Sequence, residues 1–492
     1  MKQQALLDDL VQTCANLNIR CADKLKSKEL DFLIWAGPTA TRNVQDSVQW
    51  EPYYFKKNIF LKWGYCISRV MMALPWGFVR LFKYRGFYYE FFSANGSTLL
   101  VLPIEITLGP PTYETSYLIE NVPGAIDRFV FSRGQPLSHH YHALPFLKRL
   151  QVLWTLIKVV FLDAKDQWVK KKFTQLYFES WMMLLRWVLV QGWFFHCDFY
   201  DFLKKKCSKP TSYTSLISCH EMAFYAKIIW QVAKTNHQQG ITAQHAMIYP
   251  EKLNFFPHPL EVRQAAMALP TVFYVFNEAM VEMLKPFYPK TKFLLACNPR
   301  YLKWKSMAPI PSFHVKRKIL LVSAVMFYDV SMLLTILKNL IQEDRFRDFQ
   351  YILRFHPSGE MRMRDRLWIY WARRFRNIEV SQEPLEKTLQ EVALVIGSNT
   401  TTVQEAILWG VPVLTVFHEK YLCAHVLLLT PQWRIHVDAL NLDRVRSLIA
   451  TAQASDVIAA YKKFMGLDQP VFSIQQLVQD GFIGGILNGA SL

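Results

Sequence analysis

The sequence predicts a two-domain α/β protein, and three observations lead to this prediction. The chain has 492 residues, which is more than one hydrophobic core usually serves. From residue 318 onward, short apolar runs alternate with segments of helical periodicity, as in βαβ units with a parallel sheet. A proline-bearing stretch separates this half from an N-terminal half of different composition. We therefore expect an N-terminal domain over residues 1–306, a linker over 307–317 and a C-terminal domain over 318–465, followed by a helical tail over 466–492.

The C-terminal half shows a regular order of elements. β-Branched and aromatic runs predict buried strands, and longer amphipathic runs predict helices between them. The predicted strands are residues 318–325, 349–355, 377–381, 393–398 and 411–417. The predicted helices are residues 330–342, 362–376, 384–392 and 401–410. Right-handed connections between such elements give one parallel, Rossmann-like sheet.

The N-terminal half has weaker periodicity. Buried strands are expected at residues 30–37, at 98–106 and within 240–249. Long aromatic and basic segments lie between these runs. We expect a second α/β layer that carries a large helical insertion at about residues 140–235.

The composition restricts the kind of partner and the compartment. A formal net charge of +18 favours an anionic partner, which could be nucleic acid, anionic lipid or a phosphorylated substrate. The eight cysteines include no C-x-x-C pair, which is typical of reduced thiols in a cytosolic protein. Asp8 and Asp9 interrupt the start of the chain, so no export signal is evident, and no apolar run predicts a transmembrane helix. We expect a cytoplasmic protein.

Two segments mix aromatic and basic residues. They are residues 56–85 and 146–172. Such mixtures suit the headgroup region of an anionic membrane, although core aromatics with lysine side chains that reach solvent give the same pattern. If these segments face a membrane, we expect peripheral contact with the inner face of the cytoplasmic membrane.

Polar residues follow the strand expected at 393–398, at the point where a helix is expected to begin. They are Ser398, Asn399, Thr400, Thr401 and Thr402. Free backbone N–H groups at a helix start favour a phosphate, whereas one Ser or Thr alone would be an ordinary N-cap. Glu405 lies on the same helix and could accept hydrogen bonds from a ribose, or it could be a solvated charge near a helix start.

A second loop follows the strand expected at 349–355. His356 stands just past this strand, with Arg354 before it and Pro357 after it. Ligands of open α/β sheets bind at the carboxyl ends of the strands. We therefore expect Arg354, His356 and Pro357 to join the polar loop in one nucleotide-phosphate site.

These motifs together resemble the donor domain of a GT-B glycosyltransferase. The arrangement is similar to the His-Pro and Ser/Thr motifs of bacterial sialyltransferase-like and surface carbohydrate biosynthesis proteins, which use CMP-activated nonulosonic acids or Kdo. The segments at 218–226 and 242–246 resemble the acidic helix and Gln-His-Gly motif of the same proteins, with Ala246 in place of glycine. The segment at 298–301 resembles their Gly-x-x-Arg-Tyr motif, with Asn298 in place of glycine. The resemblance covers residues 215–420 and implies two Rossmann-like domains that face a cleft.

The resemblance also implies an inverting transfer, in which a base from the N-terminal domain deprotonates the acceptor while the donor domain holds the leaving phosphate. The candidates for the base are His245 and Glu221. The chain contains no D-x-D sequence, and the His196, Asp198 and Asp201 group fits no standard spacing, so we expect no metal site and no cofactor.

The function expected from the resemblance is transfer of a sugar from a CMP-activated donor to a glycan or lipid-linked acceptor in surface polysaccharide or lipopolysaccharide biosynthesis. Two alternatives remain at this stage. One is a glycerophosphotransferase-like wall-polymer enzyme that uses CDP-glycerol, and the other is a non-enzymatic nucleic-acid-binding protein. The second accounts for the positive charge, but the sequence shows no nucleic-acid-binding signature, so we expect no nucleic-acid partner.

Overall fold

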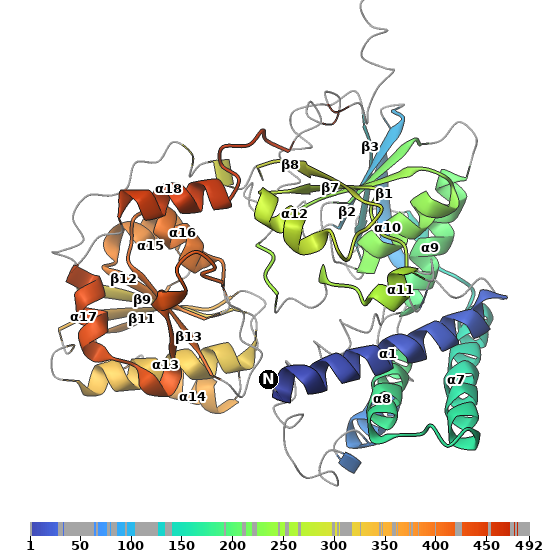
Figure 1. Cartoon of the computed structure of the whole chain (residues 1–492), viewed down its shortest axis with the longest axis horizontal. Helices are drawn as coiled ribbons and strands as arrows, with labels where there is room; N and C mark the ends of the chain where they lie inside the picture. Colours follow the sequence, from blue (N-terminus) through green and yellow to red (C-terminus); the bar gives the residue numbers. More distant parts are fainter. Residues whose placement is uncertain are drawn as a thin grey trace, which may run out of the picture.

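The structure is a computed structural model, and it describes part of the chain. The described residues are 2–27, 33, 63–64, 67–75, 79, 86–93, 96–103, 126–132, 140–190, 193–208, 213–218, 224–244, 247–250, 255–263, 267–297, 301–302, 305, 317–324, 326–343, 346, 348–356, 361, 363–372, 374, 377–381, 383–398, 400–418, 426–450, 454–472, 477 and 480. These residues form two sheets with their helices, one in each half of the chain (Figure 1).

The C-terminal sheet consists of six parallel strands. They are β9 (Lys318–Val322), β10 (Gln350–Arg354), β11 (Ile378–Val380), β12 (Leu394–Gly397), β13 (Val413–Phe417) and β14 (Arg434–His436). Their spatial order is β11-β10-β9-β12-β13-β14, and all pairs are parallel. Counted along the chain this order is 3-2-1-4-5-6, the doubly wound arrangement. Its switch point, where strand order reverses, lies between β9 and β12.

Helices cover both faces of this sheet. They are α13 (Phe327–Gln342), α14 (Met363–Ala372), α15 (Leu385–Glu391), α16 (Thr402–Leu408), α17 (Leu442–Ala450) and α18 (Ser455–Phe464). Along β9, Ile319 and Leu321 pack in the core beside α13, whereas Leu320 and Val322 pack in the core beside α16. This alternation follows from the two-residue period of a strand. Every strand and helix predicted for this half is present, and β14, α17 and α18 are additional.

The N-terminal sheet has eight strands. They are β1 (Phe87–Phe92), β2 (Thr98–Pro103), β3 (Asp127–Ser132), β4 (Tyr141–His142), β5 (Ser215–Ser218), β6 (Gln239–Ala243), β7 (Val272–Val275) and β8 (Lys292–Leu295). The order is β4-β1-β3-β2-β5-β6-β7-β8. The strands β3, β2, β5, β6, β7 and β8 are parallel to one another, and β1 pairs antiparallel with β3 and β4. The prediction of two Rossmann-like α/β units is confirmed. The strands expected within 98–106 and 240–249 are β2 and β6, while the run at 30–37 lies outside the described residues except for Leu33.

The described helices of the N-terminal half are α1 (Lys2–Lys26), α7 (Phe146–Val169), α8 (Gln175–Val190), α9 (Trp193–Cys207), α10 (Phe224–Thr235), α11 (Pro259–Arg263) and α12 (Glu278–Leu284). Helices α9, α10 and α12 pack against the sheet, whereas α1, α7 and α8 form a separate layer. Helix α1, in dark blue, lies across α7 and α8 (Figure 1). The region expected as a helical insertion holds α7, α8, α9 and α10, but it also contains the edge strand β4 and the central strand β5 of the sheet.

A buried ionic network joins these helices. The Asp163 carboxylate on α7 is fully buried and accepts hydrogen bonds from Arg20 Nε at 2.9 Å and Arg20 Nη2 at 3.1 Å on α1. It also accepts one from the Tyr177 hydroxyl on α8 at 2.8 Å. Burial raises the pKa of Tyr177, and the hydrogen bond to Asp163 raises it further. One carboxylate therefore holds three helices together.

The chain beyond α18 returns to the N-terminal sheet. Val471 forms a parallel bridge with Cys297, which follows β8, and Cys297 N donates to Pro470 O at 2.7 Å. The Tyr274 hydroxyl on β7 donates to Asp480 Oδ2 at 2.8 Å. The segment expected as a helical tail is thus bound to the first half of the chain.

Candidate functional site

The carboxyl ends of β9, β10 and β12 lie at one edge of the C-terminal sheet. Ser323 follows β9, and its backbone N–H donates to Arg354 O at 3.1 Å. The backbone N–H of His356 donates to Ser323 Oγ at 3.4 Å. Two backbone-anchored contacts therefore fix the loop after β10 against the end of β9, beside the switch point. His356 is exposed there, and Pro357 lies outside the described residues.

Arg354 is braced from the neighbouring strand. Its Nη1 donates to the carbonyl oxygen of Glu383, which follows β11. Burial lowers the pKa of Arg354, while the carboxylates of Glu386 and Glu405 act in the opposite direction. The cation and Glu405 are therefore within electrostatic reach of each other. Glu405 is 4% exposed, so it is a buried carboxylate rather than a solvated charge.

The polar loop between β12 and α16 contains one cap and one unsatisfied hydroxyl. Thr400 Oγ1 accepts a hydrogen bond from Thr402 N at 3.3 Å, and Thr401 at the helix start makes no side-chain cap hydrogen bond. The Ser398 side chain is 1% exposed, and its Oγ has no hydrogen-bond partner among the described residues. Leaving a buried hydroxyl unpaired costs about 1 to 3 kcal/mol. Ser398 thus carries a buried hydroxyl that no described residue pairs. Asn399 lies outside them.

Gly397 sets the close approach of this loop to the sheet. A Cβ atom there would meet Val403 Cγ1 at 2.4 Å and Val322 Cγ2 at 2.9 Å. Contacts this short do not occur for real Cβ atoms, so the position requires glycine. Because Gly397 has no side chain, α16 starts directly against the ends of β9 and β12.

The two candidate bases follow adjacent strands of the other sheet. Glu221 and His245 both lie outside the described residues. The strands before them, β5 and β6, are parallel neighbours. Gln244, which precedes His245, is buried and its Oε1 accepts from Phe276 N at 3.0 Å. The structure thus anchors the residue next to His245.

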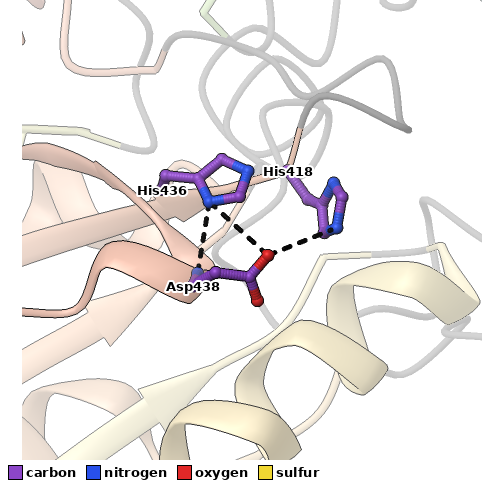
Figure 2. A group of neighbouring side chains, drawn as sticks. All are labelled: His418, His436 and Asp438. Atoms are coloured by element: carbon purple, nitrogen blue, oxygen red, sulfur yellow. Dashed lines mark hydrogen bonds and ion pairs between the residues drawn. The ribbon is translucent and has the colours of Figure 1, made fainter.

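One cluster of histidine and aspartate side chains at the sheet edge was not predicted from the sequence. His418 follows β13, His436 ends β14, and Asp438 lies in the short 3-10 helix η5 (Val437–Ala439) (Figure 2). The two histidines are 18 residues apart along the chain and form no known motif. Only the pairing of β13 with β14 brings them together, so the sequence carries no local signal for the group.

No protein-family model matches this sequence, and no curated protein is similar to it. Several solved structures resemble the chain at low identity. A glycosyltransferase from Rickettsia africae has 12% identity and a TM-score of 0.41, with 79% of this chain and 97% of that chain covered. MurG from Acinetobacter baumannii has 9% identity and a TM-score of 0.34, with 79% and 99% covered. TarM from S. aureus has 12% identity and a TM-score of 0.35, and the match covers 58% of this chain but only 57% of TarM.

Proposed function

We propose that this chain is a GT-B-type glycosyltransferase that transfers a sugar from a nucleotide-activated donor. The observation that carries the proposal is the buried, unpaired hydroxyl of Ser398 beside the switch point of a 3-2-1-4-5-6 parallel sheet. Switch points of such sheets are where nucleotides bind. The domain around residues 318–465 would hold the donor, and the domain over residues 1–306 would hold the acceptor.

The residues at this edge suit the separate parts of a nucleotide donor. Arg354 and His356 would contact the leaving phosphate, where positive charge stabilises the departing anion. Ser398 and the adjoining Asn399, Thr400 and Thr401 would donate hydrogen bonds to the phosphate oxygens, and Glu405 would accept from the ribose. Pro357 would restrict the loop that carries His356.

The donor in this proposal is a CMP-activated nonulosonic acid or Kdo, and the acceptor is a glycan or lipid-linked glycan of the cell surface. These assignments depend on the motif resemblance. A CDP-glycerol-dependent glycerophosphotransferase would use the same edge, and preferential stabilisation by CDP-glycerol over a CMP-sugar would favour it. Steeply salt-dependent binding of oligonucleotides, without nucleotide specificity, would instead favour a nucleic-acid-binding protein.

The first prediction concerns nucleotide affinity. We expect CMP to raise the melting temperature more than UDP, GDP or CDP does. His356→Ala and Ser398→Ala should each weaken CMP binding measured by calorimetry by about 1.5 to 3 kcal/mol, the contribution of one charge-assisted hydrogen bond. Without nucleotide, Ser398→Ala should be as stable as the wild type or more stable, because it removes an unpaired buried hydroxyl.

Ser180→Ala is the matched control, because Ser180 is equally buried but its Oγ donates to Leu176 O at 2.8 Å within α8. It should leave CMP affinity unchanged. If both edge variants bind CMP like the wild type, the donor-site assignment is wrong. A stronger response to UDP would leave the site in place and remove the CMP assignment.

Contact with an anionic membrane is part of the same proposal, and the solvent-facing side of α7 supports it. Four large apolar residues recur there every seventh position: Leu147, Trp154, Phe161 and Trp168 are 76%, 68%, 50% and 70% exposed. Lys158 and Lys165 lie between them on the same face, because residues three and four apart are neighbours on a helix. We call this face the α7 stripe. No helix among the described residues combines the length and hydropathy that crossing a bilayer requires.

The charge of the surroundings favours anionic lipid as the occupant. Lys170, Lys171 and Lys172 extend the stripe at its C-terminal end, and all three are exposed. The half-exposed Asp166 is paired with Lys24 at 2.7 Å, so it offsets little of this charge. Beside the stripe lies a cavity of about 340 Å³, lined by Lys24, Thr155, Lys158, Val159, Leu162 and Asp166. Lys24 and Asp166 pair with each other, so Lys158 supplies its positive charge next to the apolar surface of Val159 and Leu162. This cavity lies on the helical layer and not at the sheet edge.

The second prediction tests the α7 stripe. Wild-type protein should sediment with phosphatidylglycerol vesicles, remain in solution with phosphatidylcholine vesicles, and dissociate as salt rises. A Trp154→Ser and Trp168→Ser double variant should bind about tenfold or more weakly, because it loses two aromatic anchors.

Trp371→Ser is the control, since Trp371 on α14 is 57% exposed and lies in the other half of the chain. Equal binding of the double variant and the wild type would remove the α7 stripe as the membrane contact. Concentration-dependent dimers that the double variant abolishes would show that a second copy of the chain covers the stripe instead.

A further inference from the structure

The residues at the ends of β13 and β14 approach one another around a single carboxylate oxygen. Asp438 Oδ2 lies 3.9 Å from His418 Nε2 and 3.8 Å from His436 Nδ1 (Figure 2). One ligand atom from each of the three residues lies within 4.8 Å of the others. Both contacts to the carboxylate exceed hydrogen-bond distance, so neither ring satisfies this oxygen directly. The three groups therefore converge with their ligand atoms close together.

The donor set and its spacing fit a divalent transition metal ion. Imidazole nitrogen and carboxylate oxygen are ordinary zinc ligands, and around tetrahedral zinc such atoms lie about 3.4 Å apart. The two distances to the carboxylate, 3.8 and 3.9 Å, would shorten by about half an ångström on binding, and the distance between the two histidine nitrogens, which is within 4.8 Å, by at most about 1.4 Å. Side-chain rotation supplies a movement of this size without a change of the backbone.

Neighbouring contacts already orient one of the rings. The His436 ring packs edge-on against the Phe417 ring, with ring centroids 5.4 Å apart. The Arg434 guanidinium in turn lies over the Phe417 ring, 4.4 Å from its centroid. Asp438 N donates to His436 Nδ1 at 3.2 Å, which places the lone pair of the neutral ring on Nδ1. A metal ion would take this lone pair in place of the hydrogen bond from Asp438 N.

We propose that His418, His436 and Asp438 bind one divalent transition metal ion of the zinc type. Three protein ligands leave at least one coordination position for water or for an oxygen of a bound molecule, as in zinc sites that act on ligands. The Asp438 side chain is 69% exposed, so solvent reaches the group at this carboxylate. The site differs from the residues assigned to the donor phosphate, and it goes beyond the sequence, which predicts no metal.

The other role for these contacts is a local cap, in which His436 merely accepts the Asp438 N–H at the start of η5. That role involves His436 and the backbone of Asp438, but it assigns nothing to His418 or to the Asp438 carboxylate. Replacing His418, or Asp438 by asparagine, would therefore leave the hydrogen bond of the cap in place but weaken a metal site. This difference decides between them.

The test uses the full chain, stripped of metal with a chelator and dialysed. Titration with Zn²⁺ alone should show one tight equivalent by calorimetry, and Co²⁺ should give the intense visible absorption of a low-symmetry site. His418→Gln, His436→Gln and Asp438→Asn should each weaken Zn²⁺ binding by about tenfold to a hundredfold or more. His237→Gln removes an exposed histidine elsewhere and should leave the affinity unchanged.

The proposal is overturned if the wild type binds no stoichiometric Zn²⁺, or if the three cluster variants bind it as tightly as the wild type. Circular dichroism of each variant checks folding. If His436→Gln perturbs η5, the His418→Gln and Asp438→Asn variants still decide the question. No nucleotide or sugar is present in this experiment, so its outcome is independent of the proposed transferase activity.

Discussion

Replacing Asp163 with alanine is expected to lower the free energy of unfolding by about 3 kcal/mol, the lower end of the cost of breaking a buried ion pair, because the Arg20 side chain left behind is 33% exposed. The fully buried carboxylate is the shared acceptor for Arg20 and Tyr177, so its loss leaves a guanidinium and a hydroxyl without their partner. Urea denaturation followed by tryptophan fluorescence measures the change, because Trp181 and Trp187 lie on α8.

Asp166→Ala is the matched control for this variant. Asp166 lies three residues further along α7 and pairs with Lys24 at 2.7 Å, but its side chain is 49% exposed. Solvent screening makes such a pair weak, so the control should lose far less stability than Asp163→Ala. Equal losses in the two variants would contradict the view that Asp163 joins the three helices.

Loss of the catalytic base is expected to lower turnover by about a hundredfold or more while nucleotide affinity stays near the wild-type value. We propose His245 as this base, with Glu221 as the alternative. Both residues follow adjacent parallel strands, and the base must come from the domain that faces the acceptor. His245→Gln and Glu221→Gln, assayed by nucleotide release in the presence of acceptor, identify which residue acts.

The pH profile separates the two candidates further. A histidine base must be neutral, so the rate should fall as pH drops below about 6 to 7, whereas a glutamate base stays ionised to more acidic pH. His237→Gln and Glu278→Gln replace exposed residues of the same half and should keep full activity. If both test variants turn over at close to the wild-type rate, the base lies elsewhere and both assignments are wrong.

The C-terminal half was predictable because its strands are continuous apolar runs separated by helices of regular length. Residues 394–397 and 413–417 are almost wholly buried, as strands covered on both faces should be. The strands of the N-terminal half were harder to recognise from the sequence. Strand β5 has only four residues and is bounded by Ser215 and Ser218, so its polar ends hide a strand that lies at the centre of the sheet.

The candidate site was predictable only in part. Ser398, Arg354 and His356 stand next to recognisable strand ends, so sequence was enough to bring them to one edge. The burial of Glu405 and the missing partner of the Ser398 hydroxyl depend on packing between elements, which no local pattern encodes. The His418, His436 and Asp438 group depends on which strand is the neighbour of which, and that is a property of topology.

The return of the chain beyond α18 has a mechanical consequence. The polypeptide passes from the first sheet to the second between β8 and β9, and it passes back near Gly466, so two covalent connections join the halves. The return is held by the Asn277 side chain, which donates to Phe464 O, and by Gly466, whose φ of +70° and proximity to Phe276 O exclude a side chain. A body attached at two points can swing about the line between them, but its rotation about other axes is opposed by both tethers. Any rotation of one half against the other would therefore follow one hinge axis, and cutting the chain after residue 465 would release the other rotations.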